Sequence, residues 1–436
     1  MRSSDDIRRT FIDFFRDRGH TEIASTSLVP DGDTSVLFTS AGMQPLIPCF
    51  SGAAHPAGRR LVNIQRCLRT VDIESVGDAS HLTCFEMLGS WSLGDYFKRD
   101  ALALSLELLT DGFGLDSERL CVTVFAGYDR VPFDRESYER WIELGFAPER
   151  IHRYGREENW WGPPGPHGPC GPDSEVFYWT GDGPPQGHPE ADERWLEVWN
   201  NVFISFELTP SRDLRPLAQH NVDTGMGLER IAAVLQGGAS VYDTDVFASI
   251  RDTVRGLERT PDERAERIVS DHVRAGVMLV ADGVVPSNAR HGYVLRRLLW
   301  RAIRMGRRLG IEGPFVCDVA AAVVERFGAV HPHVAERRDR VMEVLDAEER
   351  RFGRTLRRGL GEIERLARRG VAVDGRVLFG LFETHGLPPE LSVEELAGHG
   401  IRVEGWQGEF DAGRRAHRER SREAGRGATP SRSTGT

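Results

Sequence analysis

The spacing of glycine and proline along this 436-residue chain changes near residue 240, and this change limits how the chain can fold. Before it, glycine, proline and aromatic residues interrupt short apolar runs of the kind that form strands. After it, apolar residues recur every three or four positions over long stretches, which is the period of an amphipathic helix. The sequence therefore predicts a mixed domain over 1–240 and a helical domain over 241–412.

Candidate strands and helices mix in the first part without strict alternation, which favours an α+β domain over a doubly wound parallel sheet. The expected strands are 35–42, 64–70, 119–127, 174–179 and 196–208, and the expected helices are 4–19 and 99–113. In the second part the expected helices are 243–257, 262–282, 292–310, 315–328 and 334–369. The last residues, 413–436, are polar and basic, and we expect them to form a disordered tail.

The composition excludes several classes of protein. An apolar fraction of 40% and a charged fraction of 28% are ordinary for a globular protein, and no run reaches the roughly 18 apolar residues of a membrane span. Acids and arginines interrupt the N-terminal run "MRSSDDIRRTFIDFF", so it lacks the apolar core of a secretory signal and a cytoplasmic location is expected. The six cysteines are scattered without CxxC or Cys/His spacing, so no zinc site is expected.

The run "NVDTGMGLER" at 221–230 places a carboxylate and a guanidinium on either side of two glycines. Glycine lets a backbone approach another group closely, so Asp223 and Arg230 could face a ligand with two charged regions. A strand-to-helix turn with ordinary surface charges explains the run equally well.

Two further regions suggest ligand binding. "IQRCLRT" ends a candidate strand near Arg69, and "SHLTCFEMLGSWSLGDYFK" carries Phe85; an arginine fork can grip a phosphate and an aromatic ring can stack on a base. A surface arginine and a core phenylalanine are the plainer alternative. The proline-rich stretch 158–176, with Trp161 near its start, predicts a rigid irregular loop that could wall a small pocket or simply cross the surface.

The helical part contains a basic stripe in the run "RHGYVLRRLLWRAIRMGRR" at 290–308. Arg297, Arg301, Arg304 and Arg308 follow helical spacing and share one face. Few acids lie within the run, although the whole chain has a formal charge of −10. The face could contact a phosphate backbone, or it could be a solvated helix surface.

Taken in order, several runs make the chain resemble the alanyl-tRNA synthetase family of class II aminoacyl-tRNA synthetases from about residue 5 to about 412. The matching runs are "STSLVPDGDTSVLFTSAGMQP", "FEMLGSWSLGDYFK", "GPCGPDSEVFYW", "EVWNNVF", "VDTGMGLERIAAVLQ" and "ADGVVPSNARHGYVLRRLLWRAIR". The resemblance implies an antiparallel sheet flanked by helices, followed by a helical tRNA-recognition domain. It also implies an ATP-dependent ligase that activates alanine as alanyl-adenylate and transfers it to the 3′ end of tRNA-Ala.

The resemblance further implies roles for individual residues. Arg69 and Arg230 would act on the ATP phosphates together with Mg²⁺, and Phe85 and Glu86 would hold adenine. The implied alanine pocket consists of Met43, Trp161, Asn200, Asp223 and Gly225. The implied tRNA contacts are Asn288, Arg296, Arg297, Arg301 and Glu390.

Four positions depart from the family pattern: Ser80 and Cys84 replace an arginine and a phenylalanine, Glu390 replaces an aspartate, and Asp173 replaces a cysteine. Family members also continue into an editing domain with a His/Cys metal cluster and a C-terminal domain, so a short form lacking both is expected. Two alternatives follow from these departures. The alanyl group could go to a small amine, a nucleoside-like metabolite or a carrier protein, or the chain could be a non-catalytic tRNA-binding paralog.

Overall fold

The computed structural model describes residues 2–31, 36–163 and 165–426, and a mixed sheet dominates their first half. The strands are β1 (Thr21–Glu22), β2 (Arg60–Leu68), β3 (Cys84–Leu93), β4 (Leu120–Phe125), β5 (Ile151–Tyr154), β6 (Trp160–Trp161), β7 (Gly168–Trp179), β8 (Trp195–Leu208) and β9 (Leu214–Gly227). Their order is β1-β2-β3-β9-β8-β7-β4-β5, with β6 paired to β7. The central strands are antiparallel, and only the edge pairs β1–β2 and β4–β5 are parallel.

Two local expectations differ from the structure. Residue 35 lies outside the described part, and 36–42 form no strand, because their backbone makes single hydrogen bonds to Leu28 and Leu68 in place of a ladder. The proline-rich stretch is not simply a loop, since β7 begins at Gly168. Its ladder with β8 is irregular between Cys170 and Asp173, and in this interval Gly171 and Pro172 pair with the short strand β6 on the other side.

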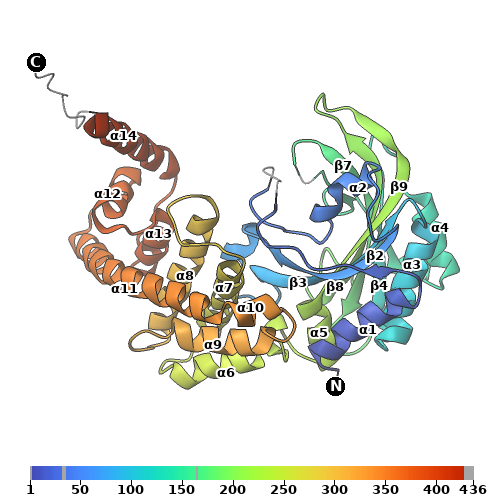
Figure 1. Cartoon of the computed structure of the whole chain (residues 1–436), viewed down its shortest axis with the longest axis horizontal. Helices are drawn as coiled ribbons and strands as arrows, with labels where there is room; N and C mark the ends of the chain where they lie inside the picture. The colour runs from blue at the N-terminus through green and yellow to red at the C-terminus, as the bar shows by residue number, and fades with distance from the viewer. Residues whose placement is uncertain (1, 32–35, 164, 427–436) are drawn as a thin grey trace, which may run out of the picture.

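Helices cover one face of this sheet (Figure 1). These are α1 (Ser4–Arg16), α3 (Lys98–Glu107), α4 (Arg135–Glu143) and α5 (Leu228–Gln236). Helix α1 begins with a capping box between Ser3 and Asp6, which satisfies amide groups that a helix start leaves without partners. Its apolar side joins the rings of Phe11 and Trp199 in the core. The short α2 (Ile47–Phe50) packs with Trp91 in a separate apolar cluster.

The second half of the chain is helical, as expected. Its main helices are α6 (Ala248–Leu257), α7 (Glu263–Ala281), α8 (Arg290–Arg308), α9 (Val316–Phe327), α10 (Pro332–Glu336), α11 (Arg338–Arg369), α12 (Gly375–His385), α13 (Pro389–Gly398) and α14 (Gln407–Arg426). Within the described residues, no helix is long and apolar enough to cross a membrane.

The expected disordered tail differs from the structure up to residue 426, because α14 continues the chain as a helix. Phe410 anchors its first turn against Phe379 and Trp406, with ring centroids 5.9 and 5.7 Å apart, and this packing supports a helix that composition alone did not predict. The remainder of the expected tail, 427–436, lies outside the described residues.

The helical part packs against the sheet where β2 ends and β3 begins, and α7 contacts β3 (Figure 1). One apolar core runs from Leu68 and Cys84 on the strand side to Val269 and Val273 of α7. The boundary near residue 240, which we retain as a proposal, follows α5 directly. Consequently, β3 is in contact with the helical part, for example through Glu86 and His331.

Candidate active site

A pocket opens where β3, β8 and β9 lie side by side, and it brings together most of the residues predicted to bind ATP and alanine. Of these it brings together Arg69, Phe85, Trp161, Asn200, Asp223, Gly225 and Arg230. Their positions follow from the sheet: β9 supplies Asp223 and Gly225 on alternate residues, and α5 begins directly after β9 and carries Arg230.

Asp223 is a buried acid of the pocket wall whose pKa is raised. It is 7% exposed, and its Oδ1 accepts a hydrogen bond of 2.7 Å from the indole Nε1 of Trp91. Burial raises the pKa of Asp223 to about 7, against the opposing effect of that hydrogen bond. The indole reaches Asp223 because residues 42 and 89 are glycines: a Cβ atom would lie 3.0 Å from the ring at Gly42 and 2.4 Å at Gly89.

Asn200 and Gly225 face each other across β8 and β9 as a register pair. The Asn200 Nδ2 donates to Glu175 Oε1 at 3.4 Å, and its buried Oδ1 has no hydrogen-bond partner among the described residues. A Cβ atom at Gly225 would lie 3.1 Å from the sulfur of Met87. This part of the pocket wall therefore offers two oxygen acceptors, on Asp223 and Asn200, and Met87 packs closely against Gly225.

Two more acids lie beneath this part of the wall on β7. Asp173 is 2% exposed and accepts from Asn159 Nδ2 at 2.9 Å, and burial raises the pKa of Asp173 to about 8. Burial and the charge of Glu197 raise the pKa of Glu175 well above its usual value. Burial therefore favours the neutral form of Asp173.

Two arginines also line the pocket. The guanidinium carbon of Arg69 lies 5.0 Å from the ring centroid of Phe85, and its Nε donates to Ser40 O at 3.1 Å. Arg230 Nη1 pairs with Glu197 Oε2 at 2.8 Å. Ser80, where the family has an arginine, also lines the wall, so only these two arginines are among the lining residues in the described part of the chain.

Two predicted site residues lie elsewhere. Glu86 does not line the pocket, because successive β3 side chains point to opposite faces: Phe85 and Met87 face the pocket, and Glu86 is buried behind it against Arg8. The prediction that Glu86 holds adenine is therefore not supported by its position. Met43 is fully buried in the cluster with Trp91, behind the pocket wall, and does not reach the pocket surface.

The structure also identifies functional residues that the sequence reasoning missed. Met87 lies against Gly225, Trp91 holds Asp223, and Glu197 pairs with Arg230. The two-residue period of β3 would have placed Met87 beside Phe85. Nothing local in the sequence indicates Trp91 or Glu197, because their partners lie 132 and 33 residues away.

Most of the basic stripe on α8 is neutralised by acids from other elements, contrary to the expectation from its local composition. Arg297 pairs with Glu74, and Arg301 donates to Ile73 O. Arg304 and Arg308 pair with acids beyond the helix, namely Glu394, Glu395 and Asp262. The face is therefore largely a structural contact, which weakens the case for phosphate binding by Arg297 and Arg301.

Asn288 and Glu390 flank the start of α8. The exposed Asn288 accepts through Oδ1 from Arg296, which is itself buried against Glu348 with Nε and Oε1 2.7 Å apart. Glu390 Oε2 accepts from Tyr293 Oη at 3.3 Å. Arg296 thus orients Asn288, and its burial leaves it no surface for a direct nucleic-acid contact.

Comparison with known proteins decides the family. The chain matches the family described as "tRNA synthetases class II (A)" over residues 6–433. It is 44% identical to the alanine–tRNA ligase of Treponema pallidum, covering 96% of this chain and 72% of that protein. The chain belongs to the alanine–tRNA ligase family of class II tRNA synthetases. The implied fold, an α+β sheet flanked by helices with a helical second part, is confirmed.

Other relatives give the same assignment. The alanine–tRNA ligase of Dehalococcoides mccartyi strain BAV1 is 42% identical over 94% of this chain and 48% of its own length. That of Rubrobacter xylanophilus is 42% identical over 97% of this chain and 50% of its own. The chain thus spans between about half and about three quarters of these relatives. The apo histidyl-tRNA synthetase of Staphylococcus aureus aligns with a TM-score of only 0.34 at 12% identity over 54% of this chain and 67% of that one, which adds nothing to the assignment.

Proposed function

We propose that this chain activates alanine with ATP and transfers the alanyl group to the 3′ end of tRNA-Ala. The observation that carries the proposal is that one pocket is lined by oxygen acceptors on Asp223 and Asn200 and by the guanidinium groups of Arg69 and Arg230. An ammonium would bind to the acceptors and phosphates to the guanidinium groups, so that the first pair forms the alanine end of the pocket in this proposal and the second pair the ATP end.

The residues at the alanine end fit this substrate. The ionised carboxylate of Asp223 would pair with the α-ammonium, and the free Oδ1 of Asn200 would accept a second hydrogen bond. Met87 and Gly225 would bound the methyl group, since they lie so close together that a Cβ atom at residue 225 would be 3.1 Å from the Met87 sulfur. The binding of alanine by these residues is thus charge-assisted and limited by size.

Phe85 and Arg69 would hold ATP at the other end. In the reaction, an oxygen of the alanine carboxylate attacks the α-phosphorus, the bond to the β,γ-pyrophosphate breaks, and alanyl-adenylate forms. Arg69 would stabilise the charge that builds on the α-phosphate, and Arg230 that on the γ-phosphate. A ribose hydroxyl of the tRNA 3′ end then attacks the alanyl carbonyl carbon and AMP leaves, so no protein nucleophile is needed.

Mg²⁺ accompanies ATP in class II synthetases and, when bound, neutralises phosphate charge. Within the described residues, no three His, Cys, Asp or Glu side chains gather in a way that could hold a metal on their own. The half-exposed Glu197 on the pocket wall is the carboxylate suited to share the ion with the phosphates. A cytoplasmic site of action is part of the same proposal.

The acceptor is the second half of the proposal. Asn288 precedes α8 and Glu390 of α13 contacts Tyr293 in the first turn of α8, so the two predicted tRNA contacts lie near the same helix end. The alanine–tRNA ligases named above are all tRNA ligases. The alternatives of a non-tRNA acceptor and of a non-catalytic paralog gain no support from these relatives. Charging of tRNA-Ala transcripts with radiolabelled alanine tests the assignment. Failure to charge tRNA-Ala while ATP–pyrophosphate exchange is robust would refute this part of it.

A further inference from the structure

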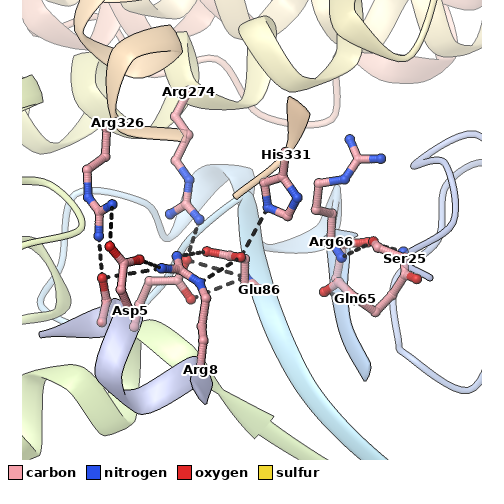
Figure 2. Close-up of polar contacts among 12 residues, drawn as sticks. Asp5, Arg8, Ser25, Gln65, Arg66, Glu86, Arg274, Arg326 and His331 are labelled. Atoms are coloured by element: carbon pink, nitrogen blue, oxygen red, sulfur yellow. Dashed lines mark hydrogen bonds and ion pairs between the residues drawn. The ribbon is translucent and has the colours of Figure 1, made fainter. Parts of the chain in front are cut away.

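A network of buried charges joins the helical part to the sheet (Figure 2) and reaches the wall of the pocket at Glu229. It contains two acids that are each 1% exposed, Glu86 of β3 and Glu229 of α5. From the helical part, His331 and Arg274 reach down to these acids (Figure 2). From below, Arg8 of α1 completes the network.

Two side chains hold Glu86. Arg8 donates through Nε at 3.2 Å and also through Nη2, and His331 Nε2 lies 3.1 Å from Oε1. Burial by itself would raise the pKa of Glu86, but Arg8 and His331 lower it well below its usual value. Glu86 is therefore an ionised group that is fixed from both α1 and the segment before α10.

Glu229 is held by Arg274 of α7, which is 1% exposed and donates through Nη2. The backbone N–H of Glu86 also donates to both Glu229 oxygens at 3.3 Å, so the two acids are linked. Within the part of the chain that the structure describes, Arg274 Nε and Nη1 have no hydrogen-bond partner, and the guanidinium carbon lies 4.6 and 5.1 Å from the ring centroids of Phe327 and Phe247. These contacts place the cation between two rings of the helical part.

Each of the two acids is next in sequence to a residue that lines the pocket. Phe85 precedes Glu86 on β3, and Arg230 follows Glu229 on α5; both line the ATP end of the pocket. We propose that Arg274 and His331 of the helical part are positioning residues for ATP, which set Phe85 and Arg230 by holding Glu229 and Glu86. This inference rests on the proposed assignment of that end of the pocket to ATP.

The alanine end has a different support. Asp223 is held by Trp91, and Asn200 by Glu175, and none of the network residues is among their hydrogen-bond partners. A stability role alone does not explain the network, because a buried ion pair often stabilises a fold no better than apolar residues of the same shape. We therefore expect substitutions in the network to weaken the binding of ATP and to leave the binding of alanine nearly unchanged.

Two conservative variants test the proposal in the full chain. Arg274→Lys keeps the charge but loses the planar fork, and His331→Gln keeps a donor that can reach Glu86. We expect either to raise KM for ATP in alanine-dependent ATP–pyrophosphate exchange by about tenfold, within the range of network couplings, and to leave KM for alanine within about twofold. Equilibrium binding of ATP without alanine should weaken to the same degree.

Arg251→Lys is the matched control. Arg251 is 4% exposed and pairs with Glu266 and Asp243 inside the helical part, away from the pocket wall. It should lower the thermal midpoint as much as Arg274→Lys without changing KM for ATP. Equal changes in both KM values, unchanged ATP binding, or the same ATP effect in Arg251→Lys would overturn the proposal. If the unaltered chain shows no alanine-dependent exchange but the ATP-binding difference is found, the amino-acid assignment fails and the positioning role stands.

Discussion

Because the pKa of Asp223 is raised to about 7, the affinity for alanine should depend on pH in a range where an ordinary aspartate would not titrate. The ammonium of alanine pairs with the ionised carboxylate, so only the ionised fraction of the free protein is competent to bind. Ionisation is lost as pH falls through the raised pKa, and with it the affinity. Alanine itself keeps its ammonium protonated over this range.

The magnitude follows from the ionised fraction. With a pKa near 7, about 91% of Asp223 is ionised at pH 8 and about 9% at pH 6. Since apparent affinity scales with the competent fraction, kcat/KM for alanine should fall about tenfold between pH 8 and pH 6, or by about 1.4 kcal/mol. A carboxyl with the usual pKa of 3.8 would give almost no change.

The assay is alanine-dependent ATP–pyrophosphate exchange from pH 6 to pH 8.5 at saturating ATP, because the profile of kcat/KM reports groups of the free enzyme. Asp173 also titrates near this range, with a pKa of about 8, so Asp173→Asn is the control and should retain the slope. A flat profile of the unaltered chain, or a slope that disappears in Asp173→Asn, would refute the reasoning.

Three further predictions concern size, charge and stability. Gly225→Ala should weaken alanine binding by about 1–3 kcal/mol with ATP binding unchanged, measured as separate KM values, because the new methyl group meets Met87; an unchanged KM for alanine would contradict the size limit. Three exposed arginines of α11 lack partners among the described residues, namely Arg351, Arg354 and Arg358. Replacing them with glutamine should reduce the salt dependence of tRNA charging, by about 0.7–0.9 in the slope of log affinity against log salt concentration for each phosphate that is no longer neutralised. Arg340 pairs with Glu343 on the same helix, so Arg340→Gln should leave this slope unchanged. Arg8→Met should cost about 3–5 kcal/mol in denaturant unfolding, because it leaves the Glu86 charge buried with one partner fewer; a loss below 1 kcal/mol would show that Glu86 is not ionised there.

The sequence predicted the architecture well, because the spacing of apolar residues differs between the two halves of the chain. Long amphipathic stretches became α6 to α11, and four of the five expected strands formed. The exception was 36–42, where Thr39 makes isolated backbone hydrogen bonds to Leu28 and Leu68 and no ladder forms. A strand needs a neighbour along its whole length, and the sequence of one segment cannot show whether that neighbour exists.

The candidate site was predicted through its motifs, and the errors arose from burial and long-range pairing. Phe85 and Glu86 were assigned together, although alternation along β3 separates them to opposite faces. The α8 stripe looked unneutralised because its partner Glu74 lies 223 residues away from Arg297. Charge patterns along one helix do not reveal acids that the fold brings in from elsewhere.

The central claim is that this pocket forms alanyl-adenylate from alanine and ATP. The most direct measurement is ATP–pyrophosphate exchange with the purified chain against a panel of amino acids, in parallel with Arg230→Ala. The account predicts exchange with alanine that is strongly reduced in Arg230→Ala, because that arginine lines the phosphate end of the pocket. Absence of alanine-dependent exchange in the unaltered chain, or full exchange in Arg230→Ala, would contradict it.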